Sequence, residues 1–234
     1  MTVPRLYVHA ELHESAEITA ASGQAHYLAK VLRRAIGDSV LLFNGRDGEW
    51  RARIVALRRD QAVLAAQTRT RLQEPEPDLW LVFALLKRNA TDLVVQKATE
   101  LGASALLPAR TTRTNTVQVN ETRLRCIAIE AAEQSERLTV PIICQPRTLP
   151  AILADWPSER RLYAAVERSE PGPLPPARGP AALLVGPEGG FTSEELDALR
   201  LHAFVALASL GPRVLRAETA CLAGLVLLQA AACG

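Results

Sequence analysis

A chain of 234 residues with 48% hydrophobic and 22% charged residues is long and apolar enough to bury the core of an ordinary globular protein. Aromatic residues make up only 4% of the chain, which argues against a large stacking surface for single-stranded nucleic acid. The four cysteines and four histidines do not fall at metal-ligand spacings, so we expect no metal site. Without a signal-peptide pattern or an apolar run long enough for a bilayer, we expect a reduced, cytoplasmic protein.

The net charge of +2 is unevenly distributed along the chain. Residues 1–72 hold 11 Lys/Arg against 7 Asp/Glu, whereas residues 73–234 hold 16 against 18. A basic first part is typical of contact with an anionic partner such as RNA. A solvated basic face explains the same excess, and charge alone does not separate the two.

The first part of the chain is rich in predicted strands. A short strand at residues 5–9 precedes a helix capped by Ser22, whose apolar stripe we expect to end near residues 37–38. Strands at 40–43, 50–57 and 62–67 follow, with a Gly-rich turn at 44–48 between the first two. These elements predict a small β-barrel with one helix.

Residues 74–78 (EPEPD) mark a linker, because two prolines and three acids in five residues suit neither a strand nor a helix. We therefore predict two domains, residues 1–72 and residues 73–234. Beyond the linker, strands are expected at 79–86, 105–108, 161–166, 182–186 and 204–209, and they alternate with helices. Two of those helices are expected at 119–138 and from about residue 217. This alternation indicates an α/β fold with a mostly parallel sheet.

Two strand-to-helix corners near the end of the chain carry the candidate chemistry. They are residues 183–191 (LLVGPEGGF) and residues 210–220 (LGPRVLRAETA). Such corners present backbone N–H groups to a ligand, although a Gly-rich turn can also be purely structural. A Walker phosphate loop and a G-x-G-x-x-G dinucleotide fingerprint are both absent from the sequence. The second corner holds Arg213 and Arg216, and two arginines in a tight loop favour a substrate site.

Five blocks of sequence carry a family resemblance. They are the two corners together with residues 96–102 (QKATELG), 130–137 (EAAEQSER) and 26–33 (HYLAKVLR). In the same order along nearly the whole chain, these blocks resemble the ribosomal RNA small subunit methyltransferase E family. The resemblance implies a PUA-like β-barrel followed by a SPOUT α/β domain with a C-terminal trefoil knot. It also implies methylation of a uridine at N3 in 16S rRNA with S-adenosyl-L-methionine.

The resemblance also implies roles for individual residues. Arg216 is the first candidate for catalysis, with Arg137 and Gln134 as partners from the long helix. Glu218 is either a proton acceptor or only part of a helix cap. The cofactor is implied to contact the two corners at Leu184, Gly186, Glu188, Gly190, Leu210, Gly211, Val214 and Leu215, and some of the apolar members of this set are expected to be simple core.

The implied partners are 16S rRNA, within the 30S subunit, and a second copy of the chain that completes each active site. The candidate RNA contacts are the basic residues Arg5, Lys30, Arg33, Arg34, Lys87 and Arg88. Two other functions stay open at this point. One is a SPOUT methyltransferase that acts on a different RNA nucleotide, and the other is a non-catalytic RNA-binding ribosome assembly factor.

Overall fold

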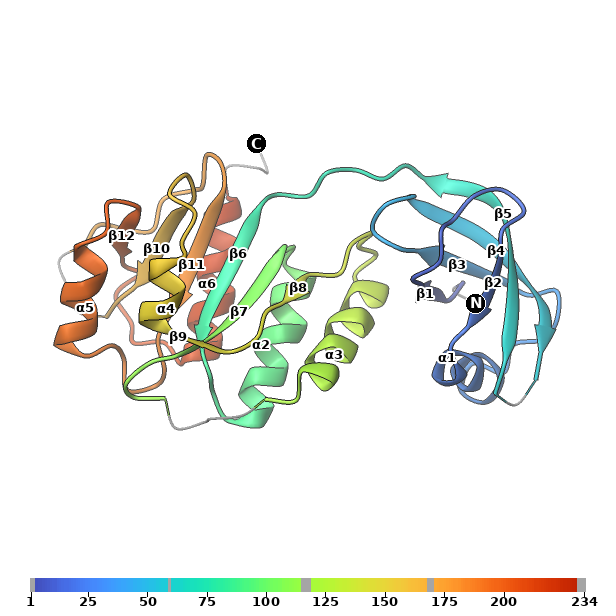
Figure 1. Ribbon diagram of the computed structural model, residues 1–234, viewed down its shortest axis with the longest axis horizontal. Helices are drawn as coiled ribbons and strands as arrows, with labels where there is room; N and C mark the ends of the chain where they lie inside the picture. Colours follow the sequence, from blue (N-terminus) through green and yellow to red (C-terminus); the bar gives the residue numbers. More distant parts are fainter. Residues whose placement is uncertain (1–2, 59, 115–118, 168–170, 231–234) are drawn as a thin grey trace. The chain divides into compact units, whose positions relative to one another are not determined.

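The computed structural model describes residues 3–58, 60–114, 119–167 and 171–230 (Figure 1). The chain divides into two compact units. The first comprises residues 1–75 and 132–140, and the second comprises residues 76–131 and 141–234. The first unit therefore includes a segment that lies well beyond the linker in sequence.

The first unit is built on a five-stranded sheet with the order β1-β3-β4-β5-β2. Only β1 and β3 pair in parallel, and the other neighbours are antiparallel. Alternate side chains of β4 enter a core that contains Leu6, Leu28 and Ile54, as expected for a sheet with one buried face. The strands are β1 (Arg5–Tyr7), β2 (Glu17–Ala20), β3 (Ser39–Phe43), β4 (Glu49–Leu57) and β5 (Ala62–Arg71).

The helix of this unit is shorter than the sequence predicts. Helix α1 (Ser22–His26) follows Ala21 as its N-cap and runs into a π-helical turn, η1 (Tyr27–Val31). Arg33 then adopts a left-handed φ of 52°, and a right-handed helix cannot continue through that backbone conformation. The predicted stripe is correspondingly incomplete, since Leu28 is fully buried and Val31 is 60% exposed.

The segment 132–140 joins the first unit through an apolar contact and a buried arginine. Ala132 and Leu138 pack on Phe43, and the Arg5 guanidinium donates to the carbonyl oxygens of Ala132, Glu133 and Arg137. These are carbonyls at and beyond the end of helix α3 (Glu121–Gln134), where backbone acceptors need partners from outside the helix. The expected helix over 119–138 is therefore too long, and Arg137 follows the helix instead of belonging to it.

The second unit is an α/β layer structure around a parallel sheet. Its strand order is β12-β10-β11-β6-β7-β8, with β9 also paired to β7, and each of these pairs is parallel. The central strand β11 is buried along its whole length, which explains its continuous apolar sequence. The strands are β6 (Leu79–Ala84), β7 (Ala105–Arg110), β8 (Ile142–Ile143), β9 (Arg147–Thr148), β10 (Arg161–Ala165), β11 (Ala181–Val185) and β12 (Val205–Ala208).

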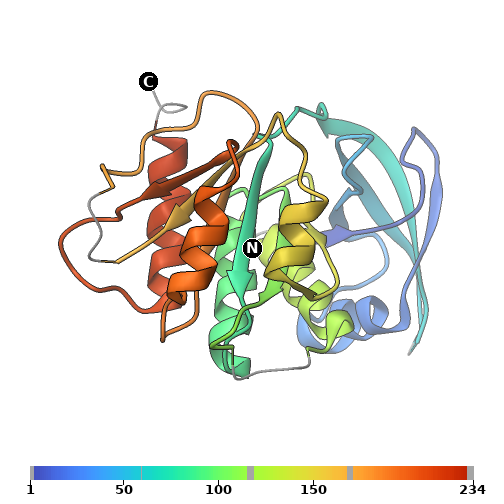
Figure 2. The same cartoon turned by 60° about the vertical axis from the view of Figure 1, so that its left-hand side comes forward.

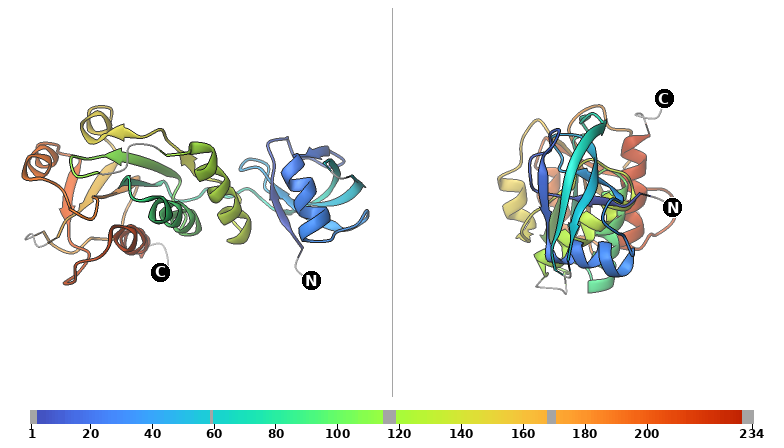
Figure 3. Two further views of the ribbon diagram at one scale, coloured as in Figure 1. Left: turned by 90° about the horizontal axis from the view of Figure 1, so that it is seen from below. Right: turned by 90° about the vertical axis from the view of Figure 1, so that its right-hand side faces the viewer.

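Helices cover both faces of this sheet (Figures 2 and 3). Helices α4 (Leu149–Ala154) and α5 (Ser193–Arg200) lie on one face, where Leu184 joins their apolar core. Helices α2 (Arg88–Glu100) and α6 (Ala217–Gln229) lie on the other. At Gly224 of α6 an added Cβ would come within 2.5 Å of Leu183, so a glycine is needed for this close approach to β11.

The α/β prediction is confirmed by this sheet, and the elements that the sequence analysis missed are short. They are β2, β8, β9 and α4. Strands β8 and β9 have two residues each, too few to show the alternation by which strands are recognised. Helix α4 has six residues, with a proline in its first turn and Thr148 as its N-cap.

Candidate functional site

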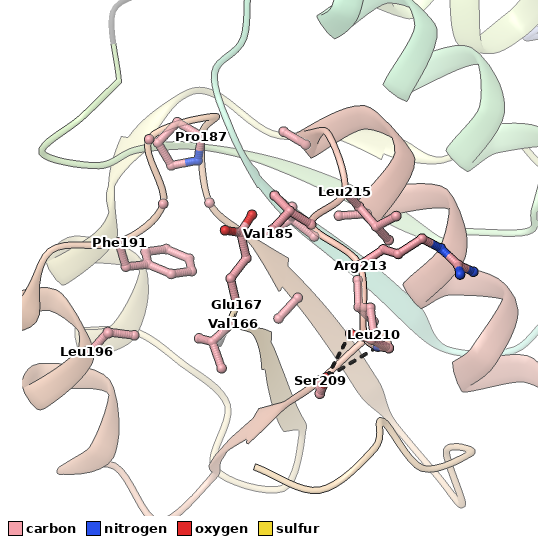
Figure 4. Close-up of a pocket in the computed structure, with 18 of the residues that line it drawn as sticks. Val166, Glu167, Val185, Pro187, Phe191, Leu196, Ser209, Leu210, Arg213 and Leu215 are labelled. Carbon is pink, nitrogen blue, oxygen red and sulfur yellow. Dashed lines mark hydrogen bonds between the residues drawn. The ribbon is translucent and has the colours of Figure 1, made fainter. Parts of the chain in front are cut away.

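A pocket of about 630 Å³ opens where β10, β11 and β12 end and their loops begin (Figure 4). The carboxyl edge of a parallel sheet is the usual ligand site of α/β proteins. The pocket is lined by Ala165, Val166, Glu167, Val185, Gly186, Pro187, Gly189, Gly190, Phe191, Leu196, Ser209, Leu210, Gly211, Pro212, Arg213, Val214, Leu215, Ala217 and Ala220. Segments from three strand ends and the start of α6 therefore share one cavity.

The loop after β11 forms the first wall. Gly190 has a left-handed φ of 68° and donates its N–H to the Pro187 carbonyl at 2.8 Å, which closes a tight turn. The Phe191 ring then folds back over Gly186, where an added Cβ would meet the ring at 3.2 Å. Gly186 therefore leaves room for an aromatic side chain that faces the pocket.

The loop after β12 forms the facing wall. Gly211 adopts a φ of 119°, a backbone conformation that favours glycine, and its N–H donates to Ser209 Oγ at 3.2 Å. Leu210 and Leu215 add apolar surface to this wall. The loop between β10 and β11 is hydrogen-bonded to this wall, because the Leu174 N–H donates to the Ser209 carbonyl oxygen at 3.0 Å.

Among the residues that the structure describes, two ionisable side chains, Glu167 and Arg213, line the pocket. The Glu167 carboxylate lies between the two walls, whereas the Arg213 side chain extends away from the cavity (Figure 4). The other lining side chains are apolar, apart from the Ser209 hydroxyl. The cavity combines a mostly apolar interior with loop backbone and the inward carboxylate of Glu167, which suits an uncharged or cationic organic ligand.

Arg216 and Glu218 lie at the start of α6, beside the pocket. Arg216 is the exposed N-cap residue of the helix, and Glu218 is in its first turn, where an acid interacts well with the helix dipole. Cys221, one turn further, is fully buried. Burial raises the pKa of its thiol far above the ordinary value, so Cys221 stays a neutral thiol and is not a nucleophile at neutral pH.

Two families of known proteins match this chain. The family described as "RNA methyltransferase domain" matches residues 73–229, and the one described as "RNA methyltransferase PUA domain" matches residues 21–66. Ribosomal RNA small subunit methyltransferase E of Rickettsia conorii is 35% identical over 228 residues, which cover 94% of this chain and 92% of that protein. The chain belongs to the ribosomal RNA small subunit methyltransferase E family. The resemblance drawn from the five sequence blocks is thereby confirmed.

Solved structures of two similar proteins have the same fold. Ribosomal RNA small subunit methyltransferase E from Neisseria gonorrhoeae, bound to S-adenosyl methionine, matches with a TM-score of 0.89 and 28% identity and covers 98% of both chains. A methyltransferase of Legionella pneumophila in complex with the same cofactor matches with a TM-score of 0.88 and 29% identity, over 99% of this chain and 98% of that one. A PUA domain ahead of an α/β methyltransferase domain is thus the architecture of this chain.

Of the residues predicted to contact the cofactor, six line the pocket: Gly186, Gly190, Leu210, Gly211, Val214 and Leu215. Leu184 and Glu188 do not. Leu184 is fully buried in the core beneath α4 and α5, because alternate residues of a strand face opposite sides of the sheet. Glu188 is an exposed residue of the loop after β11.

The end of β10 also contributes to the pocket, which was not predicted from the sequence. Ala165, Val166 and Glu167 line the pocket, as do Phe191 and Leu196 from the loop after β11 and helix α5. The signal for the first three was available, since parallel strands bring their carboxyl ends to one edge of a sheet. No Gly-rich motif follows β10, so the sequence around this strand end did not indicate a ligand site.

The four predicted catalytic residues belong to two units. Arg216 and Glu218 belong to the second unit, and Gln134 and Arg137 belong to the first. Arg137 is only 8% exposed, and its guanidinium donates to Thr139 Oγ1 at 3.0 Å.

The predicted RNA contacts differ in exposure, and one of them, Arg5, is buried and has to be corrected. Lys30 and Arg33 are exposed in the first unit, Arg34 is half-buried there, and Lys87 and Arg88 are exposed at the start of α2. Arg5 is different: its side chain is 7% exposed and forms an ion pair with Glu49. A guanidinium already bound on all sides by protein acceptors is not available to a phosphate, so Arg5 is a structural residue and not an RNA contact.

Neither a metal-binding cluster nor a membrane-spanning helix occurs in the part of the chain that the structure describes. That part of the chain holds no group of three or more His, Cys, Asp or Glu side chains placed to bind a metal ion. None of the helices described there is long and apolar enough to span a bilayer.

Proposed function

We propose that this protein transfers a methyl group from S-adenosyl-L-methionine to N3 of a uridine in 16S rRNA. The observation that carries the proposal is the pocket between the loops after β11 and β12, in a chain that belongs to the ribosomal RNA small subunit methyltransferase E family. The similar proteins from Neisseria and Legionella, each with this cofactor bound, support the choice of methyl donor.

The residues of the pocket fit this cofactor. Its volume of about 630 Å³ lies within the range of sites for small organic molecules. Apolar side chains such as Leu210 and Leu215 suit the faces of an adenine ring, and the loop backbone suits its polar edge. Glu167, the inward carboxylate, suits a molecule that carries a sulfonium and an ammonium group. When bound, S-adenosyl-L-methionine supplies an electrophilic methyl group.

Arg216 is the residue that we assign to the substrate base. The N3 proton of uridine is weakly acidic, and its removal leaves a negative charge shared with O2 and O4. An exposed guanidinium at the start of α6 can donate hydrogen bonds to a carbonyl oxygen that gains charge. We assign to Glu218 the role of accepting the N3 proton, with Gln134 and Arg137 as further donors to the base.

A second copy of the chain brings these residues together in our proposal, so that each active site is completed by the partner subunit. Helix α6 supports this arrangement because it is apolar on more than its buried face. Leu225 and Leu228 are buried, whereas Val226 is 52% and Leu227 is 38% exposed. Apolar side chains exposed next to one another on a helix favour coverage by a partner.

We assign RNA binding to the basic residues of both units. Lys30, Arg33 and Arg34 would contact the phosphate backbone from the PUA-like domain, for which we keep the bounds 1–72, and Lys87 and Arg88 from the domain 73–234. We further propose that the C-terminal part of the second domain forms a trefoil knot. The insertion of β11 between β10 and β6 is compatible with such threading. We also infer a cytoplasmic location, where ribosomal subunits are assembled.

The test incubates the purified protein with 30S subunits and methyl-labelled S-adenosyl-L-methionine, followed by digestion of the RNA to nucleosides. We expect the label in 3-methyluridine, with more incorporation into 30S subunits than into free 16S rRNA. Label in another nucleoside would replace the proposal by a methyltransferase for a different position. RNA binding without cofactor binding or label would identify a non-catalytic assembly factor.

A further inference from the structure

The loop that follows β7 is tied to the loop that forms the first wall of the pocket. Its residues Thr111–Thr114 form a tight turn, in which Thr114 N–H donates to the Thr111 carbonyl at 3.1 Å and Thr111 N–H donates to Thr114 Oγ1 at 3.0 Å. This turn is held by its own hydrogen bonds and presents Thr112 and Arg113 toward the neighbouring loop.

Arg113 binds the backbone of the pocket wall directly. Its Nη1 donates to the Gly189 carbonyl oxygen at 2.5 Å and approaches the Phe191 carbonyl oxygen at 3.5 Å. Its aliphatic stem lies along Gly189, since an added Cβ there would be 3.2 Å from Arg113 Cδ. The missing side chain at Gly189 therefore makes room for Arg113.

Thr112 makes a second tie to the far end of the same loop. Its N–H and Oγ1 both donate to Glu195 Oε1, at 2.7 and 3.0 Å. Glu195 Oε2 in turn accepts the Thr192 N–H at 2.9 Å, as part of the capping box that begins α5. The turn after β7 thus fixes the loop both at Gly189 and at the start of α5.

Phe191 links Arg113 to the pocket. Its carbonyl oxygen faces Arg113, and its ring covers Gly186 and lines the cavity. We propose that Arg113 is a positioning residue for cofactor binding, which acts by holding the 186–191 loop and the Phe191 ring in their binding geometry. This inference rests on the proposed function of the pocket as the S-adenosyl-L-methionine site.

The test measures binding of S-adenosyl-L-methionine by isothermal titration calorimetry with the full-length protein. Arg113→Ala is expected to raise the Kd about tenfold, because two hydrogen bonds that shape the wall are lost. Arg113→Lys, which can donate to one carbonyl, should recover part of this loss. Arg200→Ala is the control, because Arg200 lies in α5 of the same unit, is not among the residues that line the pocket, and forms an exposed pair with Asp197.

A double-mutant cycle tests whether Arg113 acts through Gly189. Gly189→Ala should raise the Kd by displacing the Arg113 stem, and the backbone of Gly189 lies outside the left-handed region, so alanine is tolerated there. In the Arg113→Ala background, the same change should add little, because the side chain that it displaces is gone. Additive effects of the two changes would contradict the mechanism.

Activity on 30S subunits separates positioning from catalysis. At saturating S-adenosyl-L-methionine, Arg113→Ala should keep kcat within about twofold of the unchanged protein. An unchanged Kd, a loss confined to kcat, or a raised KM for RNA alone would each overturn the inference. If the unchanged protein itself does not bind S-adenosyl-L-methionine, the proposed function fails instead, and the two failures are thereby distinguished.

Discussion

Arg5 Nε donates to Glu49 Oε2 at 2.8 Å in a buried ion pair, and the same guanidinium holds the end of helix α3. Glu49 also accepts a hydrogen bond from Thr70 Oγ1 at 2.8 Å. A strand residue near the start of the chain thus attaches the segment 132–140, which contains Gln134 and Arg137, to the first unit.

Arg5→Ala should destabilise the first unit strongly, by about 3–5 kcal/mol, because it leaves the Glu49 carboxylate buried and several carbonyls without a donor. Hydrogen exchange of the β4 and β5 amides measures this loss in the first unit alone. Arg147→Ala is the matched control, because Arg147 pairs with Asp155 at the surface and should cost less than about 1 kcal/mol. Equal protection in the two variants would contradict a structural role for Arg5.

Cys221 should make the protein less stable as the pH rises above about 9. Burial raises the pKa of this thiol in the folded state above its ordinary value of 9.0. In that range the unfolded chain loses the proton and the folded chain keeps it, so stability falls by up to about 1.4 kcal/mol per pH unit. Urea unfolding at pH 8 and pH 10 measures the effect as the difference between the unchanged protein and Cys221→Ala. A difference that does not change with pH would contradict this prediction.

Arg216→Ala should lower kcat by about 10²–10³-fold, the usual cost of removing a donor to developing oxyanion charge. The Kd for S-adenosyl-L-methionine should change little, because the Arg216 side chain is not part of the pocket lining. Single-turnover methylation of 30S subunits measures the effect, and Arg216→Lys should recover only part of it. If Arg216→Ala raised the Kd and left kcat intact, Arg216 would belong to the cofactor site.

Reversing the charges of Arg33 and Arg34 to glutamate should weaken binding to 30S subunits and flatten its dependence on salt. Each lost phosphate contact lowers the slope of log K against log salt by about 0.9 for a duplex. Filter binding at several salt concentrations measures the slope. The matched control is Arg58→Glu, another basic residue of the first unit that is not among the proposed contacts. Equal slopes for the two variants would remove Arg33 and Arg34 from the RNA site.

Mixing two inactive variants tests whether the active site is shared between subunits. Arg137→Ala and Arg216→Ala should each be inactive alone. If each site combines residues from both chains, a mixed dimer contains one intact site, and an equal mixture regains about a quarter of the activity. Circular dichroism must first show that Arg137→Ala folds, because Arg137 is largely buried. With folded variants, the absence of any recovery would place the complete site within one chain.

The fold class and most of the pocket could be predicted from the order of the amino acids alone. Continuous apolar runs identified the central strands β6 and β11, because a strand buried on both faces needs apolar side chains at every position. Glycines marked the two loops of the pocket, because Gly190 and Gly211 adopt left-handed conformations that other residues rarely occupy. Burial of a strand and a left-handed loop conformation each restrict the residue types at particular positions, so both can be recognised in short stretches of sequence.

The roles of Arg5, Leu184 and Arg113 depend on contacts that form in the folded chain. The sequence shows that a residue is charged or apolar, but not whether its side chain meets solvent, a core or a distant carbonyl. Arg5 meets backbone acceptors more than a hundred residues away, Leu184 faces the core instead of the cavity, and Arg113 binds a loop 76 residues further along the chain. These contacts depend on how the strands and loops assemble in three dimensions, so they cannot be predicted from patterns of neighbouring residues.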